Sequence, residues 1–81
     1  MRNTNVLDID GKEIFEGDIV AIYTAAIWKL EGNKELMEKA AGRYRVVYKH
    51  QDFRLEEISP HWFHPPYNSS VHEFTVLKVI E

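Results

Sequence analysis

The feature that most restricts how this chain can fold is a near-alternation of side-chain types from Arg43 to Lys49. Tyr44, Val46 and Tyr48 occupy one set of alternate positions, and basic residues occupy most of the other set. Successive side chains of a strand point to opposite faces, so this pattern predicts a strand with one apolar face. A short connection leads to residues 53–58, which alternate at their start. The sequence therefore predicts an antiparallel hairpin over residues 43–58.

Three further segments are predicted to be strands because they alternate or are rich in β-branched residues. They are residues 6–10, residues 18–24 and residues 73–80. Asp10-Gly11 and Gly17-Asp18 are residue pairs typical of tight turns. Residues 59–70 contain all three prolines, which cannot donate to a strand ladder, so this stretch is predicted to be irregular.

One short helix is predicted over residues 34–41, where strong helix formers follow one another. Asn33 is a suitable N-cap residue, and Gly42 is a suitable residue to follow the last turn. The apolar stripe of this helix is expected to dock against the strands or to cover one end of them. Its members are Leu36, Met37, Ala40 and Ala41.

Short strands with one helical insertion favour a mainly β fold, either a small SH3-like barrel or a strongly bent antiparallel sheet. The chain has 81 residues, of which 44% are hydrophobic, so it is expected to fold as one domain over residues 1–81 with a single core. The chain contains no cysteine, which excludes stapling by disulfides.

The sequence contains neither a basic-then-apolar leader nor an apolar run long enough to span a bilayer, so a cytoplasmic location without a membrane role is expected. The formal net charge of −3 gives no overall attraction to polyanions. Any binding of nucleic acid is therefore expected to depend on a local basic patch.

The segment Asp8-Ile-Asp-Gly-Lys-Glu-Ile-Phe-Glu-Gly-Asp-Ile-Val20 resembles the opening motif of the YopX family of phage and prophage proteins, with Phe15 where that family usually has Tyr. The resemblance is close over the first quarter of the chain and loose over the rest. It implies a β-barrel-like fold, a bacterial or phage origin and no assigned enzymatic activity. It supplies no catalytic residues.

The residues of this segment also predict a structural role without reference to any family. Gly11 and Gly17 permit the backbone angles of two close turns, and Asp18 is expected to brace the second turn. Ile14, Ile19 and Val20 are expected among the first core residues. The alternative is a site for a divalent cation, although the spacing is not that of a calcium loop. Its candidate carboxylates are Asp8, Asp10, Glu13, Glu16 and Asp18.

Aromatic residues are concentrated in the proline-containing stretch, where Trp62, Phe63 and Tyr67 accompany Pro65 and Pro66. Aromatic rings give a large contact area at a small entropy cost, so this loop is a candidate surface for a protein partner. The alternative is that a domain this small folds the loop over its own core. Trp28, which precedes the helix, is expected to be a core or helix-docking residue.

A basic strip is a second candidate surface, since four cations are expected on the outward face of the predicted hairpin. They are Arg43, Arg45, Lys49 and Arg54. Together with aromatic rings they would suit phosphates and stacked bases. The alternative is an ordinary solvated hairpin face, because Glu56 and Glu57 dilute its positive charge.

Catalytic chemistry has little support. His61 and His64 have a spacing that suits zinc, but no cysteine accompanies them, and surface or half-packed histidines are the alternative. No serine or threonine lies in a nucleophile motif.

We therefore predict a non-catalytic accessory protein of phage or prophage origin, without cofactor, metal or small-molecule substrate, that binds a protein partner or a second copy of itself. The alternative is a weak nucleic-acid-binding module, and a metal-dependent hydrolase ranks last.

Overall fold

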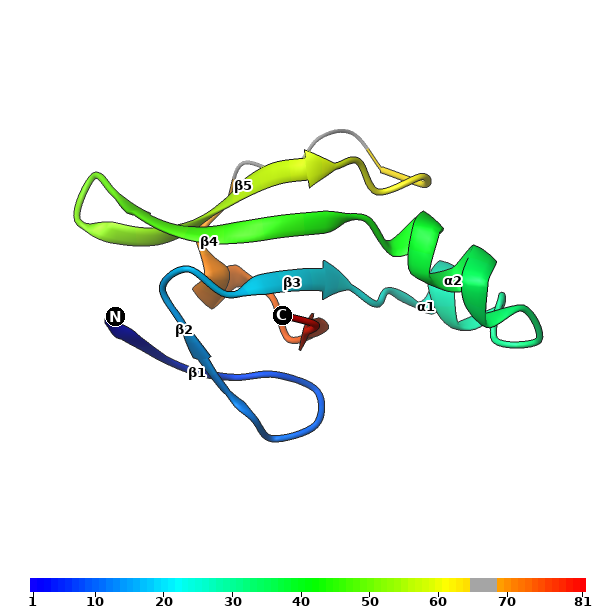
Figure 1. Ribbon diagram of the computed structural model, residues 1–81, viewed down its shortest axis with the longest axis horizontal. Helices are drawn as coiled ribbons and strands as arrows, with labels where there is room; N and C mark the ends of the chain where they lie inside the picture. The colour runs from blue at the N-terminus through cyan, green and yellow to red at the C-terminus, as the bar shows by residue number, and fades with distance from the viewer. Residues whose placement is uncertain (65–68) are drawn as a thin grey trace.

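The computed structural model describes residues 1–64 and 69–81, and most of its regular structure is β-strand. β1 (Asn3–Leu7) and β2 (Glu13–Phe15) form a two-stranded antiparallel sheet. The second sheet has four antiparallel strands in the order β5-β4-β3-β6 (Figure 1). These strands are β3 (Ile19–Ile22), β4 (Arg43–Lys49), β5 (Asp52–Ser59) and β6 (Leu77–Val79).

The predicted hairpin is confirmed as β4 and β5, which pair from Lys49 opposite Asp52 to Arg43 opposite Ser59. The two residues of its turn, His50 and Gln51, both have positive φ angles, of 55° and 62°. Such angles match the right-handed twist of the strands that they join.

The C-terminal strand is shorter than the predicted residues 73–80. Val71–Glu73 form instead a turn of 3-10 helix, η1. The side chain of Ser70 accepts a hydrogen bond from the backbone N–H of His72 at 3.3 Å and so caps this turn, while Val71 is fully buried beneath it. Residues 74–76 belong to neither element, and β6 begins at Leu77.

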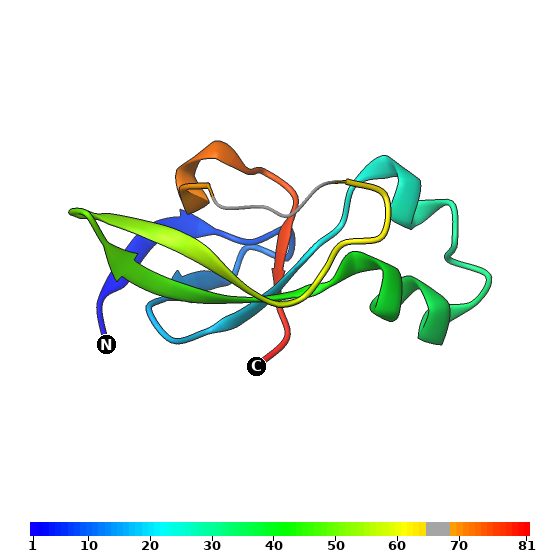
Figure 2. The ribbon, with the colours of Figure 1, turned by 90° about the horizontal axis from the view of Figure 1, so that it is seen from above.

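The predicted helix is confirmed as α2 (Lys34–Ala41). The side chain of Asn33 accepts a hydrogen bond from the N–H of Leu36 at 3.1 Å, and Gly42 ends the helix with a φ of 76°. A single helical turn that the sequence did not predict, α1 (Ala25–Trp28), precedes it. Both helices lie at one end of the molecule, beyond the ends of β3 and β4 (Figure 2).

The buried side chains form two clusters. The larger one lies between the sheets and consists of Ile14, Val20, Ile22, Tyr44, Val46, Leu55, Val71 and Leu77. The smaller one lies where the helices meet β3 and consists of Ala21, Tyr23, Ile27, Ala40 and Ala41. The stripe predicted for α2 thus docks through its alanines, and Met37 packs partly buried against the same cluster.

The mainly β fold class is confirmed, with antiparallel strands throughout. Within the described residues the sheets do not close into a barrel, because β5 and β6 remain the two ends of the four-stranded order. None of the helices in residues 1–64 and 69–81 is both long and apolar enough to cross a membrane.

Candidate functional site

The N-terminal motif ties the two ends of the chain together. One carboxylate oxygen of Asp8 accepts hydrogen bonds from the backbone N–H groups of Asp10 and Lys12, at 2.9 and 2.8 Å. The other accepts from the N–H of Val79 in β6 at 3.0 Å. Burial alone raises the pKa of Asp8, but these three hydrogen bonds outweigh it and lower that pKa below its usual value. Asp8 is therefore a structural anion.

The other motif residues also have structural roles. Asp18 accepts a hydrogen bond from the N–H of Phe15 at 2.8 Å, which braces the second turn as predicted. Gly11 and Gly17 have the positive φ angles that were expected, and Ile14, Ile19 and Val20 are buried. Within residues 1–64 and 69–81 no group of three or more carboxylates or histidines could hold a metal ion. The described carboxylates of the motif therefore do not form the cation site that was the alternative.

The loop that carries Trp62 and Phe63, which we call the aromatic loop, has its backbone held at three successive residues. The N–H of His61 donates to the hydroxyl of Tyr44 at 2.9 Å, and the N–H of Trp62 donates to the carbonyl of Ala40 at 3.0 Å. The N–H of Phe63 donates to Nδ1 of His61 at 3.2 Å. The first two bonds connect residues 61–62 to β4 and to the last turn of α2, so two elements of the fold fix the position of this part of the loop.

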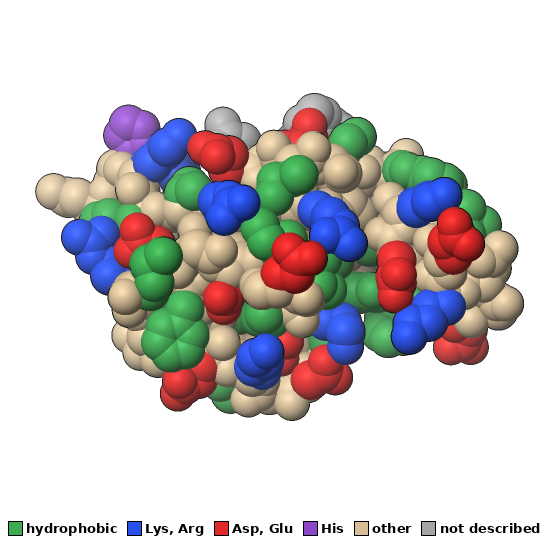
Figure 3. Space-filling view, in the orientation of Figure 1, with side chains coloured by type: hydrophobic (Ala, Val, Ile, Leu, Met, Phe, Trp, Pro, Cys, Tyr) green, Lys and Arg blue, Asp and Glu red, His purple; other side chains and the backbone are tan. Residues whose placement is uncertain are grey.

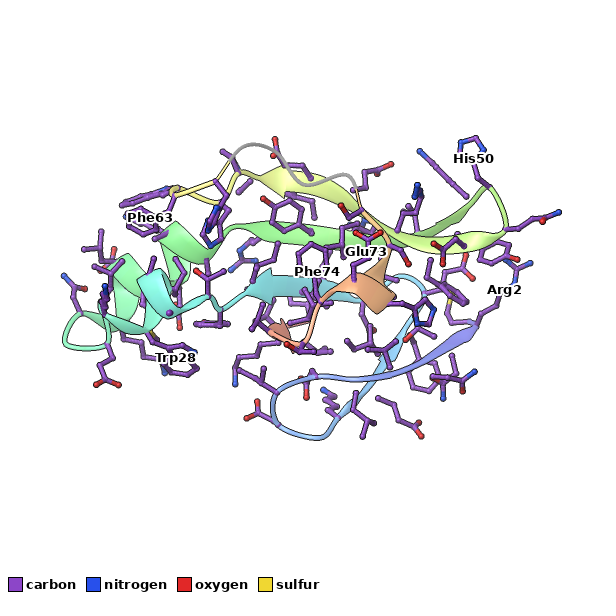
Figure 4. The ribbon with its side chains drawn as sticks, turned by 180° about the vertical axis from the view of Figure 1, so that it is seen from behind. Arg2, Trp28, His50, Phe63, Glu73 and Phe74 are labelled. Carbon is purple, nitrogen blue, oxygen red and sulfur yellow. The ribbon has the colours of Figure 1, made fainter. Side chains whose placement is uncertain are left out.

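The aromatic side chains of this loop nevertheless remain accessible. Trp62 is 54% exposed and Phe63 is 49% exposed, so the alternative in which they fold into the core is wrong for both rings. Phe63 lies at the helical end of the molecule, the end where Trp28 also lies (Figure 4). The third predicted residue, Tyr67, lies outside the described residues.

His61 differs from its neighbours because its side chain is buried, so the interpretation of both histidines as surface or half-packed is wrong for His61. Burial lowers the pKa of His61, and the nearby His64, whose ring centre is 5.0 Å away, lowers it further. Since Nδ1 accepts the Phe63 N–H, the proton of the neutral ring is on Nε2, which is 3.5 Å from the hydroxyl of Thr24. His61 thus acts as a neutral brace of the loop.

A groove that the sequence did not predict lies between α2 and the edge of the sheet formed by β6. Its volume is about 510 Å³. Tyr23 and Trp28 supply its aromatic wall, with ring centres 5.3 Å apart. Trp28 was expected to be a core or helix-docking residue; its ring contacts that of Tyr23, yet the residue is 46% exposed and not in the core. We call this cavity the helix–sheet groove.

The rim of the helix–sheet groove is charged. Lys34 and Glu38 come from α2, Arg43 from the start of β4 and Lys78 from β6. α2 and the C-terminal end of the chain lie on the same side of the molecule (Figure 2). In the space-filling view of that side, basic and acidic side chains intermingle around apolar ones (Figure 3).

A second, smaller groove of about 290 Å³ lies between α2 and the end of β5. Trp62 and Pro60 form part of its wall, and we call it the loop groove. Glu38 and Arg43 line both grooves, so the two cavities adjoin. Each groove contains one of the two tryptophans of the chain.

The register of the hairpin places the four predicted basic residues on one face. Cross-strand partners share a face of a sheet, and Arg45 lies opposite Glu56, Val47 opposite Arg54 and Lys49 opposite Asp52. Acidic residues therefore alternate with the cations, and Lys49 forms an ion pair with Glu56 at 3.2 Å. The fourth residue, Arg43, lies 3.6 Å from the carboxylate of Glu81.

In comparisons with known proteins, no protein-family model, no curated protein and no solved structure matches the chain.

Proposed function

We propose that this chain is a non-catalytic accessory protein that binds a protein partner, or a second copy of itself, through Trp62 and Phe63. One observation carries the proposal: both rings are about half exposed, although hydrogen bonds fix the backbone at three successive residues beneath them. The resemblance of residues 8–20 to the YopX motif favours a phage or prophage origin, and a cytoplasmic location suits a chain without cysteine.

A fixed backbone with exposed rings is the arrangement expected of a binding surface. Aromatic side chains dominate the energetics of many interfaces because they bury a large area and lose few rotamers. A loop that is already ordered loses less entropy when the partner arrives. The loop groove beside Trp62 adds a concave surface to these rings.

The experiment compares Trp62→Ala with Leu7→Ala, which removes a similarly exposed apolar side chain from the N-terminal hairpin. We expect both variants to keep the melting temperature of the native chain. Self-association is measured by sedimentation, and partner capture from host extract by quantitative mass spectrometry. Only Trp62→Ala should abolish the association. Equal association by both variants would contradict the proposal, as would a collapse of folding in Trp62→Ala.

Nucleic-acid binding is the second candidate, and the shared face of the basic residues favours it. Those residues are Arg43, Arg45, Lys49 and Arg54. Binding to phosphates releases counterions, so affinity for single- or double-stranded oligonucleotides should fall steeply as salt rises. A fluorescence titration at about 50 mM salt or below that shows no binding would end this candidate.

A further inference from the structure

We propose that the helix–sheet groove receives an acidic segment of the protein partner, one that carries an apolar side chain next to its carboxylates. This inference rests on the proposed function, because it assumes that the partner is a protein. It adds a second contact site to the aromatic loop and specifies the chemistry of what binds there.

The aromatic wall of the groove suits one bulky apolar side chain. Trp28, which is 46% exposed, lines the groove together with the buried Tyr23, whose ring centre lies 5.3 Å away. Met37 of α2 and Ile80, which follows β6, complete the apolar lining. A side chain inserted beside Trp28 would remove apolar surface from water on both partners, which is the main favourable contribution at the centre of interfaces.

The rim of the groove suits carboxylates. Among the residues that line the groove, three cations (Lys34, Arg43 and Lys78) outnumber one carboxylate (Glu38), on a chain whose formal net charge is −3. None of the described residues forms an ion pair with Lys34. Charge complementarity of this kind selects partners and speeds association.

The other two cations already have exposed partners within the chain. Arg43 is 3.6 Å from Glu81, and Lys78 is 2.6 Å from Asp10. Ion pairs between exposed groups contribute little free energy, so a partner carboxylate can replace Glu81 beside Arg43 at small cost. Glu81 thus occupies one of the positions that we assign to the partner's acidic residues.

The two grooves adjoin, because Glu38 and Arg43 line both of them. A segment that contacts Trp62 in the loop groove reaches Trp28 by crossing this pair. The partner contact proposed above for the loop therefore extends along α2 into the helix–sheet groove.

The experiment uses the full chain and a display library of random peptides of one length. We expect the enriched peptides to contain Asp or Glu next to an aromatic or large aliphatic residue. The binding of one enriched peptide is then followed by NMR through the indole N–H signals of the two tryptophans, which Trp28→Phe and Trp62→Phe assign. The Trp28 signal reports on the helix–sheet groove, and the Trp62 signal reports on the loop groove.

Charge reversal provides the matched comparison. Lys34→Glu should weaken binding of the enriched peptide about fivefold or more, because it replaces attraction with repulsion at the rim. Lys12→Glu makes the same change of charge on the N-terminal hairpin, outside both grooves, and should leave binding within about twofold. Both substitutions are at exposed positions, so folding is expected to be unaffected.

The outcomes separate this inference from the proposed function. Peptides without acidic residues, an unmoved Trp28 signal, equal binding by Lys34→Glu and Lys12→Glu, or no enrichment at all would each overturn the inference. In those cases a partner captured through Trp62 would still support the proposed function. If Trp62→Ala loses partner capture and the enriched peptide also shifts the Trp28 signal, the results would support both the proposed function and this inference.

Discussion

The hydroxyl of Tyr44 accepts a hydrogen bond from the backbone N–H of His61 at 2.9 Å, and both groups are buried. This bond connects the start of β4 to the first residue of the loop that presents Trp62 and Phe63. A tyrosine on the apolar face of the hairpin thus supplies both core volume and a polar anchor for the proposed contact surface.

The first prediction concerns Tyr44→Phe, which keeps the ring in the core and removes the acceptor of the His61 N–H. A buried donor left without its partner costs about 1–3 kcal/mol, so the free energy of unfolding should fall by that amount in urea titrations. The Trp62 indole signal should also broaden or shift, because the loop loses one of its three fixed points.

Tyr48→Phe is the control for this prediction. Tyr48 lies on the same strand but is 39% exposed. Tyr48→Phe also removes a tyrosine hydroxyl, but from this exposed position. Its effect should stay within about 0.5 kcal/mol, as is usual for surface substitutions. Equal losses in the two variants would show that the hydroxyl of Tyr44 does not hold the loop.

The second prediction concerns Gly42, where α2 meets the loop. A Cβ atom at this position would lie 2.8 Å from the carbonyl oxygen of Ser59 and 2.9 Å from the N–H nitrogen of His61. Both are backbone atoms, so Gly42→Ala forces the loop away from α2. We expect a loss of more than about 2 kcal/mol in the free energy of unfolding, from this clash and from the positive φ of 76°.

Substitutions at two other glycines separate the cost of the steric clash from the cost of the positive φ angle. Gly11 has a positive φ but open space around its Cβ position, so Gly11→Ala should show only the backbone cost of about 1–2 kcal/mol. Gly32 has open space and no positive φ, so Gly32→Ala should be neutral or slightly stabilising. If Gly42→Ala cost no more than Gly11→Ala, the contact between α2 and the loop would be looser than the structure has it.

Elements whose signals are local could be predicted from the sequence. The hairpin follows from the alternation of Arg43–Lys49, and α2 follows from its helix formers, Asn33 and Gly42. The N-terminal turns follow from glycines whose φ angles are positive. The strand predicted over residues 73–80 is too long at its start: Glu73 belongs to a 3-10 turn that the side chain of Ser70 caps, which an apolar run does not reveal, and β6 begins only at Leu77.

The candidate site could be predicted only in part. The composition of the loop identified Trp62 and Phe63, but their exposure depends on where β4 and α2 hold the backbone. The backbone of His61 is held by the hydroxyl of Tyr44, seventeen residues earlier in the chain, and no local pattern reveals this contact. The helix–sheet groove was missed because its walls come from α1, α2, β3, β4 and β6, and only tertiary structure brings these together.

The third prediction concerns Asp8→Asn. The Asp8 carboxylate accepts hydrogen bonds from three backbone N–H groups through both of its oxygens. The amide of Asn has only one oxygen, which is a weaker acceptor, and its NH₂ group cannot accept a hydrogen bond from the remaining N–H. Losing a hydrogen bond to a charged group costs about 1.5–3 kcal/mol, and the free energy of unfolding should fall by that amount at neutral pH. Asp10→Asn, at an exposed ion pair with Lys78, should cost less than about 1 kcal/mol.

The pH dependence of Asp8→Asn provides a second test. The pKa of Asp8 is lowered in the folded state, so the unfolded state binds the proton more readily. The stabilisation is complete above the unfolded pKa of about 3.9 and is lost as the pH falls through the folded pKa. The difference between native chain and variant should therefore shrink below about pH 4. A difference that stays constant down to lower pH would contradict the assigned role.

The fourth prediction concerns the buried ring of His61. Burial and His64 lower its pKa in the folded state, so at mildly acidic pH the unfolded state binds the proton that the folded state resists. Its neutral form is needed because protonation of Nδ1 removes the acceptor of the Phe63 N–H. The free energy of unfolding should be highest above the unfolded pKa of about 6.5 and should fall as the pH drops from there towards the folded pKa.

His61→Gln isolates this contribution, because the other three histidines are present in both proteins. The variant should be less stable than the native chain at about pH 7.5, and the gap should narrow as the pH falls to about 5, since only the native chain has a buried imidazole to protonate. Urea titrations at several pH values measure both curves, and the Trp62 indole signal shows whether the loop loosens over the same range. Parallel stability curves would show that His61 is not held neutral in the fold, and the brace assigned to its ring would then be wrong.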